Sequence, residues 1–319
     1  MNANTNAPPT RDTQLAMADF PTNGCANLGA ILDTRKCADL RAWIDSQRPV
    51  NSDIFYQTPE EFEQYGRWTR YAPGRDDHNL LLSPELDLTF IEENPAFQDA
   101  MVQLCGANWK VMKKSIIRST PRHVLPDWLY EWMLEVGRPN LNPFVKDEFQ
   151  DVQYFLTTDF HQDKTRPESN FVTVYIYLDE VDPQYSALQI LCGSHKPGMN
   201  TYPHNLRRGF ADKTKWYYSD GNGNHETCYE QVVTGEAGSI FCFHCLTLHG
   251  TGLNDSENPR ISLRYLVEMG GGADDGSCLL AQANGQVYGP TAVTLNRTDV
   301  GPDGAFLRIG SSLLSHSNS

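Results

Sequence analysis

Several features that would identify common protein classes are missing from this 319-residue chain. No stretch approaches the roughly 20 apolar residues that a membrane-spanning helix needs. The opening residues, MNANTNAPPTRDTQ, lack both the basic start and the apolar core of a secretory signal. Basic residues are few, with 26 Lys and Arg against 40 Asp and Glu, so the formal net charge is −14 and polyanions are repelled. We therefore expect a cytoplasmic protein with no membrane or nucleic-acid partner.

The cysteine patterns of disulfide-rich proteins and zinc ribbons are also missing. The eight cysteines are scattered along a chain that is too long to need a disulfide framework, and we expect most of them to be small buried hydrophobic residues. Cys242 and Cys245 form a C-x-x-C, but a structural zinc site would need a second pair at similar spacing. A zinc ribbon is therefore not expected.

The length and the absence of internal repeats favour one elaborated domain. We expect a flexible tail at 1–18 and a single domain at 19–319, with a β core at about 109–268 and a C-terminal extension at 270–319. Helical spacing of apolar residues predicts one helix within 28–48, capped by Asp33 or Thr34, and a second within 92–106 that ends at Gly106.

Beyond residue 109 the pattern changes to short runs rich in β-branched and aromatic residues. These strand candidates are WKVMKKSIIRS, QYFLTTDFHQD, NFVTVYIYLDE, ALQILCGSH, GSIFCFHCLTLHG and PRISLRYLVEMG. Closely spaced strands without intervening helices predict an antiparallel sandwich or barrel. The fold class is thus mainly β with flanking helices (α+β), and 197–232 is expected to be a long polar connection.

The proline-bounded, aromatic-rich segment 122–145 interrupts the strands, and a helix is predicted from Pro126 to Val136. Two interpretations are equally favoured: a helix that only covers one face of the sheet, or a lid over an active site.

A metal site is indicated by His161-Gln162-Asp163, because strand alternation places His161 and Asp163 on the same face. Two neutral imidazoles and one carboxylate suit iron(II), which must keep open positions for a cosubstrate and oxygen. The triplet alone is weak evidence. It gains weight because His249 follows another strand and is itself followed by Thr251 and, eleven residues on, by Arg260.

These residues resemble the phytanoyl-CoA dioxygenase (PhyH-like) family of 2-oxoglutarate oxygenases over about 150–268. The resemblance rests on FHQDKT, VYIYLDEVDPQYSALQILCGSHKPG, GEAGSIFCFH and LHGTGLNDSENPRISLRY. It implies a double-stranded β-helix (jelly-roll, cupin-like) core in which His161, Asp163 and His249 bind iron. Strand spacing alone indicates only an all-β core.

The same resemblance implies a 2-oxoglutarate site. Arg260 would grip the remote carboxylate, which a forked guanidinium suits, and Thr251 would assist. The family uses a Lys on an earlier strand, which nominates Lys113 or Lys114, of which at most one faces inward. Gln153 is a weaker candidate for the cosubstrate.

Other polar residues stay open or are expected to be structural. Arg264 could pair with a substrate acid or form an ordinary salt bridge, since it shares a strand face with Arg260. His195 and His244 are expected to be structural. The family's turn before G-S-H differs here at Ser186 and Cys192, which leaves the proposed ligands intact.

The function implied is oxidation of an unactivated C–H bond of a small-molecule substrate with Fe(II), 2-oxoglutarate and O2, releasing succinate and CO2. Hydroxylation is the default outcome, desaturation or cyclisation is possible, and Asp163 disfavours halogenation. A non-catalytic metal-binding β-sandwich protein is the alternative, and a hydrolytic zinc enzyme is a third interpretation. The substrate and the oligomeric state are left open.

Overall fold

The computed structural model describes residues 15–66, 79–136, 140–163, 168–200, 205–219, 224–270 and 278–289. The helices are α1 (Phe20–Asn23), α2 (Thr34–Gln47), α3 (Pro59–Tyr65), α4 (Thr89–Glu92), α5 (Pro95–Cys105), α6 (Asp127–Val136) and α7 (Leu279–Asn284). The strands are β1 (Cys25–Ala30), β2 (Lys110–Ser119), β3 (Gln153–Phe155), β4 (Thr158–His161), β5 (Phe171–Tyr177), β6 (Leu188–Cys192), β7 (Asn205–Arg208), β8 (Lys215–Ser219), β9 (His225–Val233), β10 (Ser239–His244), β11 (His249–Thr251) and β12 (Arg260–Glu268).

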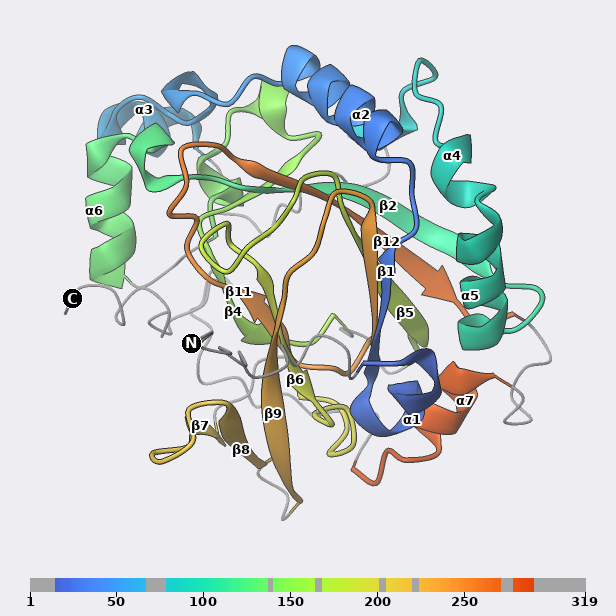
Figure 1. The fold of residues 1–319 in the computed structure, drawn as a ribbon. Helices are drawn as coiled ribbons and strands as arrows, with labels where there is room; N and C mark the ends of the chain where they lie inside the picture. Colours follow the sequence, from blue (N-terminus) through green and yellow to red (C-terminus); the bar gives the residue numbers. More distant parts are fainter. Residues whose placement is uncertain are drawn as a thin grey trace, which may run out of the picture.

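The strands form two six-stranded sheets (Figure 1). The first has the order β1-β10-β5-β12-β2-β3 and the second the order β4-β11-β6-β9-β8-β7. All neighbours are antiparallel except β2 and β3. From β4 onward the chain crosses between the sheets repeatedly, as β5, β10 and β12 lie in the first sheet and β4, β6, β9 and β11 in the second. This winding is a double-stranded β-helix, which confirms the expected fold class.

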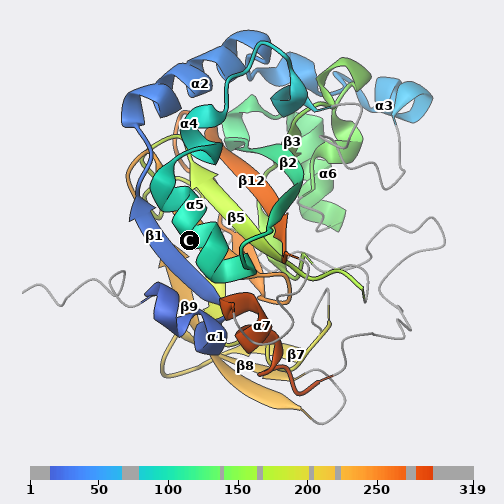
Figure 2. The ribbon, with the colours of Figure 1, turned by 90° about the vertical axis from the view of Figure 1, so that its right-hand side faces the viewer.

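The first sheet has two differently buried faces. Its outer face carries Ile116, Val174 and Leu263, which join the large core that it forms with the helices. In the turned view, α2, α4 and α5 lie outside this sheet (Figure 2). Its inner face carries Tyr175 and Phe243, which meet Ile190 and other residues of the second sheet in a separate core. Alternate residues of each strand in this sheet therefore point to opposite sides. One set packs against the helices, and the other set faces the interior between the two sheets.

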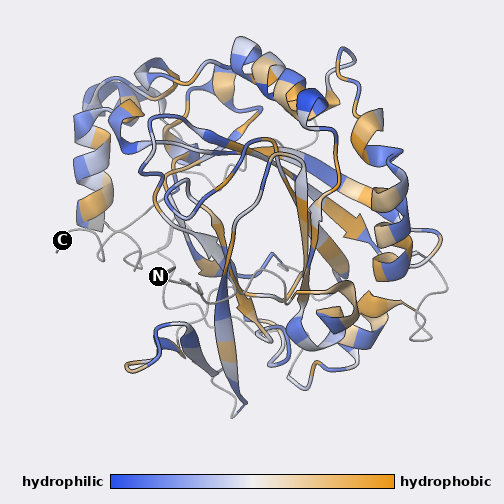
Figure 3. Cartoon of the chain, viewed as in Figure 1, coloured by the Kyte–Doolittle hydropathy of each residue, from blue (hydrophilic) through white to orange (hydrophobic). Residues whose placement is uncertain are grey.

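The helix predicted within 28–48 is confirmed as α2, which begins at the predicted cap. Asp33 caps α2 by accepting a hydrogen bond from the Lys36 amide, as predicted for this position. Residues 28–30, however, finish β1, which pairs with β10 and was not predicted. The pairing fixes an extended backbone, and Asp33 begins the helix only after it. The second helix, α5, ends before Gly106 as expected. Figure 3 shows polar and apolar residues alternating along these covering helices.

The predicted polar connection at 197–232 is wrong in part, because β7, β8 and most of β9 lie within it. Only Cys228 and Val233 of β9 are buried, so the apolar periodicity that identifies a strand is weak there. Residues 15–18 were expected to belong to a flexible tail. Leu15 is buried, and its carbonyl accepts a hydrogen bond from the Asn27 amide, so 15–18 belong to the folded part.

The helix expected after Pro126 is confirmed as α6. Its neighbourhood is an aromatic cluster: Phe144 lies 4.6 Å from Phe62 and 5.0 Å from Trp132, measured between ring centroids. The Trp128 indole also donates to the Gln57 carbonyl. These contacts tie the segment to α3. A lid role for 122–145 stays a prediction.

Residues 1–14, residues 67–78 and most of the extension at 270–319 lie outside the described residues. Among the helices that the structure does describe, none combines the length and the apolar character needed to cross a membrane.

Candidate metal and cosubstrate site

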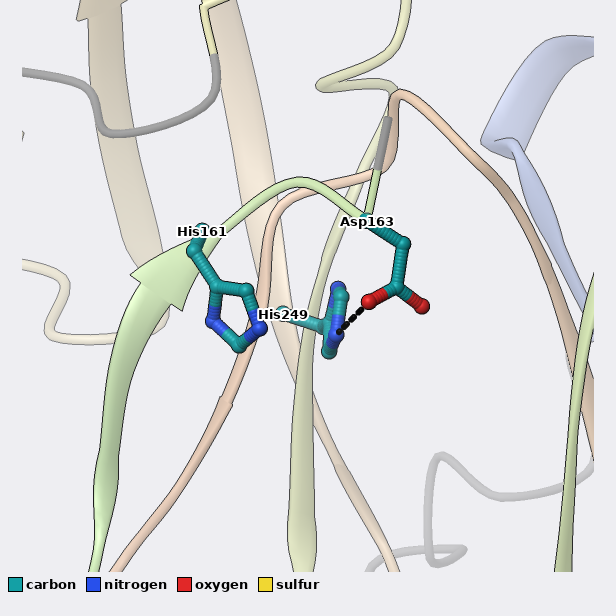
Figure 4. A group of neighbouring side chains, drawn as sticks. All are labelled: His161, Asp163 and His249. Atoms are coloured by element: carbon teal, nitrogen blue, oxygen red, sulfur yellow. Dashed lines mark ion pairs between the residues drawn. The ribbon is translucent and has the colours of Figure 1, made fainter. Parts of the chain in front are cut away.

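The three predicted metal ligands come together at one end of the second sheet (Figure 4). His161 ends β4, His249 begins β11, and the two residues are paired partners in the sheet. Asp163 lies two residues past β4. One possible ligand atom from each residue lies within 4.8 Å of the others, and no further cluster of this kind occurs within the described ranges. The pairing of β4 with β11 thus brings the H-x-D motif and His249, which are far apart in the sequence, into one set of ligands.

Hydrogen bonds fix the orientation of both imidazoles. His161 Nδ1 lies 2.8 Å from the Asp159 carbonyl oxygen, and His249 Nδ1 lies 3.1 Å from that of Thr247. A carbonyl can only accept, so Nδ1 carries the proton in each ring and Nε2 keeps its lone pair. This is the tautomer that a metal ion needs, and ligating histidines commonly make such a contact.

The ionisation states also suit a divalent cation. Burial, and then the neighbouring His161, lowers the pKa of His249 to about 3, so this ring is neutral at physiological pH. The 3.8 Å contact from His249 Nε2 to Asp163 Oδ1, dashed in Figure 4, is therefore not an ion pair at physiological pH. For Asp163, burial acts to raise the pKa, but Arg264 and the two imidazoles lower it below the ordinary range. A neutral His249 imidazole and an ionised Asp163 carboxylate result.

The two oxygens of Asp163 have different surroundings. The Thr173 hydroxyl donates to Oδ2 at 2.6 Å, while Oδ1 faces His249 and lies 3.4 Å from Arg264 Nη1. Thr173 is fully buried on the inner face of β5. Oδ1 is therefore the oxygen presented to a metal. Sequence reasoning missed Thr173, although its hydroxyl is conspicuous in the otherwise apolar and aromatic run FVTVYIY.

Arg260 begins β12 and is completely buried. Its Nη1 donates to the Ser262 hydroxyl, and its guanidinium lies 5.6 Å from the ring of Tyr175 and 5.7 Å from that of Tyr177. Nε has no hydrogen-bond partner in the part of the chain that the structure covers. A buried cation with an unused donor fits an anionic ligand such as the remote carboxylate of 2-oxoglutarate.

Thr251 lies on β11 opposite Leu188, whose side chain belongs to the core between the sheets. Its hydroxyl accepts a hydrogen bond from the Thr158 amide at 3.1 Å and lies 3.2 Å from the Thr158 hydroxyl. The residue thus shares the interior with Arg260, and its hydroxyl also braces β11 against β4.

The register resolves the two lysine candidates. Lys113 is paired with Leu266, which places it on the inner face, whereas Lys114 is paired with Tyr265 on the helix side. There the Lys114 ammonium forms an ion pair with Glu92 of α4. The nomination of Lys114 is thereby corrected, because strand alternation turns it away from the interior. Gln153 is buried on β3 in register with Ile117, an inner-face residue.

The comparison with protein families matches residues 20–262 to the phytanoyl-CoA dioxygenase (PhyH) family. The chain belongs to the phytanoyl-CoA dioxygenase family. The members of that family are oxygenases that use iron(II), 2-oxoglutarate and O2, and the donor set described above fits such an iron ion.

Individual relatives of this PhyH-family chain are distant. A Stutzerimonas stutzeri protein described as a probable alpha-ketoglutarate-dependent hypophosphite dioxygenase is 32% identical over 133 residues, or 39% of this chain. The match spans 43% of that protein, less than half of its length. Among solved structures, the carbocyclase SnoK from nogalamycin biosynthesis is 16% identical with a TM-score of 0.46, covering 85% of this chain and 92% of SnoK. The epimerase SnoN from the same biosynthesis is 15% identical with a TM-score of 0.46, covering 93% and 95%.

Two other histidines of this PhyH-family chain, His195 and His244, have structural contacts. His195 Nε2 lies 3.1 Å from the Pro21 carbonyl oxygen, and His244 Nε2 lies 2.9 Å from Asn284 Oδ1 of α7. Both rings are fully buried, and they tie α1 and α7 to the sheets. These contacts agree with the structural roles expected for them.

Proposed function

We propose that this chain is an iron(II)- and 2-oxoglutarate-dependent dioxygenase that oxidises an unactivated C–H bond of a small molecule. Hydroxylation is the proposed outcome. The observation that carries this is the combination of the ligand cluster His161, Asp163 and His249 with a wholly buried arginine, Arg260, that has an unused donor. A non-catalytic metal-binding protein has no use for Arg260 in that position, and a hydrolytic zinc enzyme needs a general base instead.

In this proposal each residue has a definite task. His161 and His249 would supply Nε2 lone pairs and Asp163 would supply Oδ1, and three protein ligands would leave room at the metal for a cosubstrate and O2. Arg260 and Thr251 hold the remote carboxylate of 2-oxoglutarate, and inner-face Lys113 and Gln153 are further candidates for cosubstrate contacts. When bound, iron would activate O2, which is the oxidant, and 2-oxoglutarate would supply two of the four electrons that O2 takes up, leaving as succinate and CO2.

Apolar side chains cover the His249 side of the ligand cluster. Phe243 packs against the His249 ring at 4.4 Å between centroids, and Ile190 pairs with His249 in the sheet. An apolar wall beside the ligands protects a reactive site from side reactions and strengthens its electrostatic interactions.

The proposal is tested by measuring succinate formed from 2-oxoglutarate by the purified protein, with Fe(II) and O2 present and in the absence of added substrate. Many such sites turn over slowly without substrate, so the expected result is slow succinate formation that Asp163→Ala abolishes. Succinate formation at an equal rate in both proteins would refute the assigned ligands. Absence of succinate in the wild type, together with absence of Fe(II) binding, would refute the oxygenase.

A further inference from the structure

A second arginine, Arg264, lies on the same strand face as Arg260. Across the sheet it is paired with Ser115 and with Tyr175, so its side chain enters the interior between the sheets. The side chain of Arg264 is 18% exposed, whereas Arg260 is completely buried. Arg260 therefore lies in the closed part of the interior, while Arg264 reaches a part of the site that is open to solvent.

Arg264 is poorly satisfied in its present contacts. Its Nη1 lies 3.4 Å from Asp163 Oδ1, well beyond the roughly 2.7–2.9 Å of a charge-assisted hydrogen bond. Its Nε is buried and has no hydrogen-bond partner among the residues described. A guanidinium with several donors thus makes a single long contact with one carboxylate oxygen.

That one contact is with the oxygen that the metal requires. Thr173 already holds Oδ2 of Asp163 at 2.6 Å, and Oδ1 is the oxygen that faces His249. A metal ion held by the three ligands would draw on the Oδ1 electron pairs. The long bond from Arg264 would weaken further, and its guanidinium would stand beside a cation.

The charges of the assembled site leave Arg264 without a counterion. The two positive charges of Fe(II) are balanced by Asp163 and by one carboxylate of 2-oxoglutarate. Arg260 balances the other carboxylate. A largely buried guanidinium without an anion is unfavourable, so Arg264 needs a negative group that arrives with another molecule.

We propose that Arg264 receives an anionic oxygen group of the substrate, and hence that the substrate is a small acid, with a carboxylate or comparable oxyanion that orients it at the metal. This inference rests on the proposed function and names the substrate class for that site. The planar fork of arginine suits such groups, because it can donate two parallel hydrogen bonds.

Trifluoroacetate is a suitable probe, because it carries one carboxylate and is followed by ¹⁹F NMR. The protein is loaded anaerobically with Co(II) and 2-oxoglutarate, each binding is measured first, and trifluoroacetate is then titrated. Co(II) shortens the ¹⁹F relaxation times of a probe bound beside it. The variants are Arg264→Gln, Arg264→Lys and, as a matched control for charge, Arg207→Gln on the distant edge strand β7, where Arg207 is exposed.

The expected result is saturable relaxation enhancement in the wild type and in Arg207→Gln. Arg264→Gln should weaken the apparent affinity about tenfold or more, as for a lost hydrogen bond to a charged group, and Arg264→Lys should retain part of it. No enhancement in the wild type, or equal enhancement in Arg264→Gln, would overturn the inference. So would loss of 2-oxoglutarate binding in Arg264→Gln, which would assign Arg264 to the cosubstrate. Failure of wild type to bind Co(II) and 2-oxoglutarate appears before the probe is added and refutes the proposed function instead.

Discussion

Replacing Thr173 with valine should weaken metal binding without disturbing the fold. Valine has nearly the same shape but removes the hydroxyl that donates to Asp163 Oδ2 at 2.6 Å. A hydrogen bond to a charged group contributes about 1.5–3 kcal/mol, which corresponds to a loss of roughly 10- to 150-fold in affinity. Residues that orient metal ligands commonly contribute about 10- to 100-fold, so the two ranges agree.

The assay is competition for Fe(II) or Co(II) with a chelator of known affinity, under anaerobic conditions. Thr173→Ser, which keeps the hydroxyl, should restore most of the affinity. Thr120→Val is the matched control, because Thr120 is equally buried and its hydroxyl makes no hydrogen bond with a described residue. Thr173→Val with metal affinity within about twofold of wild type, in a protein of unchanged melting temperature, would refute the idea that Thr173 orients Asp163.

Three further predictions concern ligands, buried charge and pH. Asp163→Ala should abolish Fe(II) binding by chelator competition, and near-normal affinity would show that another residue completes the site. Asp45→Ala should lower the free energy of unfolding in urea by about 3 kcal/mol, because the buried Arg118 guanidinium loses its ion-pair partner, and a change below about 1 kcal/mol would contradict this. Burial, followed by His244, lowers the pKa of His195 well below 6.5, so the folded state resists the proton that the unfolded state binds. As pH falls below about 6.5, His195 should therefore lower the free energy of unfolding by up to about 1.4 kcal/mol per pH unit. Above pH 6.5 it should have no effect. His195→Gln should show a smaller stability loss between pH 7 and pH 5 than wild type, and an identical loss would contradict the assignment.

The sequence predicted the interior of the fold better than its edges. Strand β5 is buried on both faces, and its nearly continuous run of apolar, aromatic and β-branched residues identifies it directly. Strands β7, β8 and β9 expose one face, and β1 depends on pairing with β10, so local composition alone does not reveal them. Such strands form because they pair with segments far away in the sequence, and that pairing cannot be recognised from one sequence.

For the site, motif spacing was sufficient to nominate the ligands but not their surroundings. The choice between Lys113 and Lys114 needed the register of β2 against β12, because a shift of one residue exchanges the two faces. The hydrogen bond from Thr173 to Asp163, and the different surroundings of the two Asp163 oxygens, depend on how β5 packs beside the ligands, which motif spacing does not reveal. Arg264 was recognised in sequence as a cation on the face of Arg260, and its long contact with Asp163 emerged from the packing.

The most direct test of the central claim is anaerobic titration of the protein with Fe(II) and 2-oxoglutarate, followed by visible absorption. Chelation of 2-oxoglutarate to iron gives a weak charge-transfer band. We predict that wild type and the exposed control Arg207→Gln develop this band at saturating Fe(II). Arg260→Gln should need at least about tenfold more 2-oxoglutarate, and Arg260→Lys should fall between them. A wild-type protein that binds Fe(II) but forms no band with 2-oxoglutarate would contradict the account.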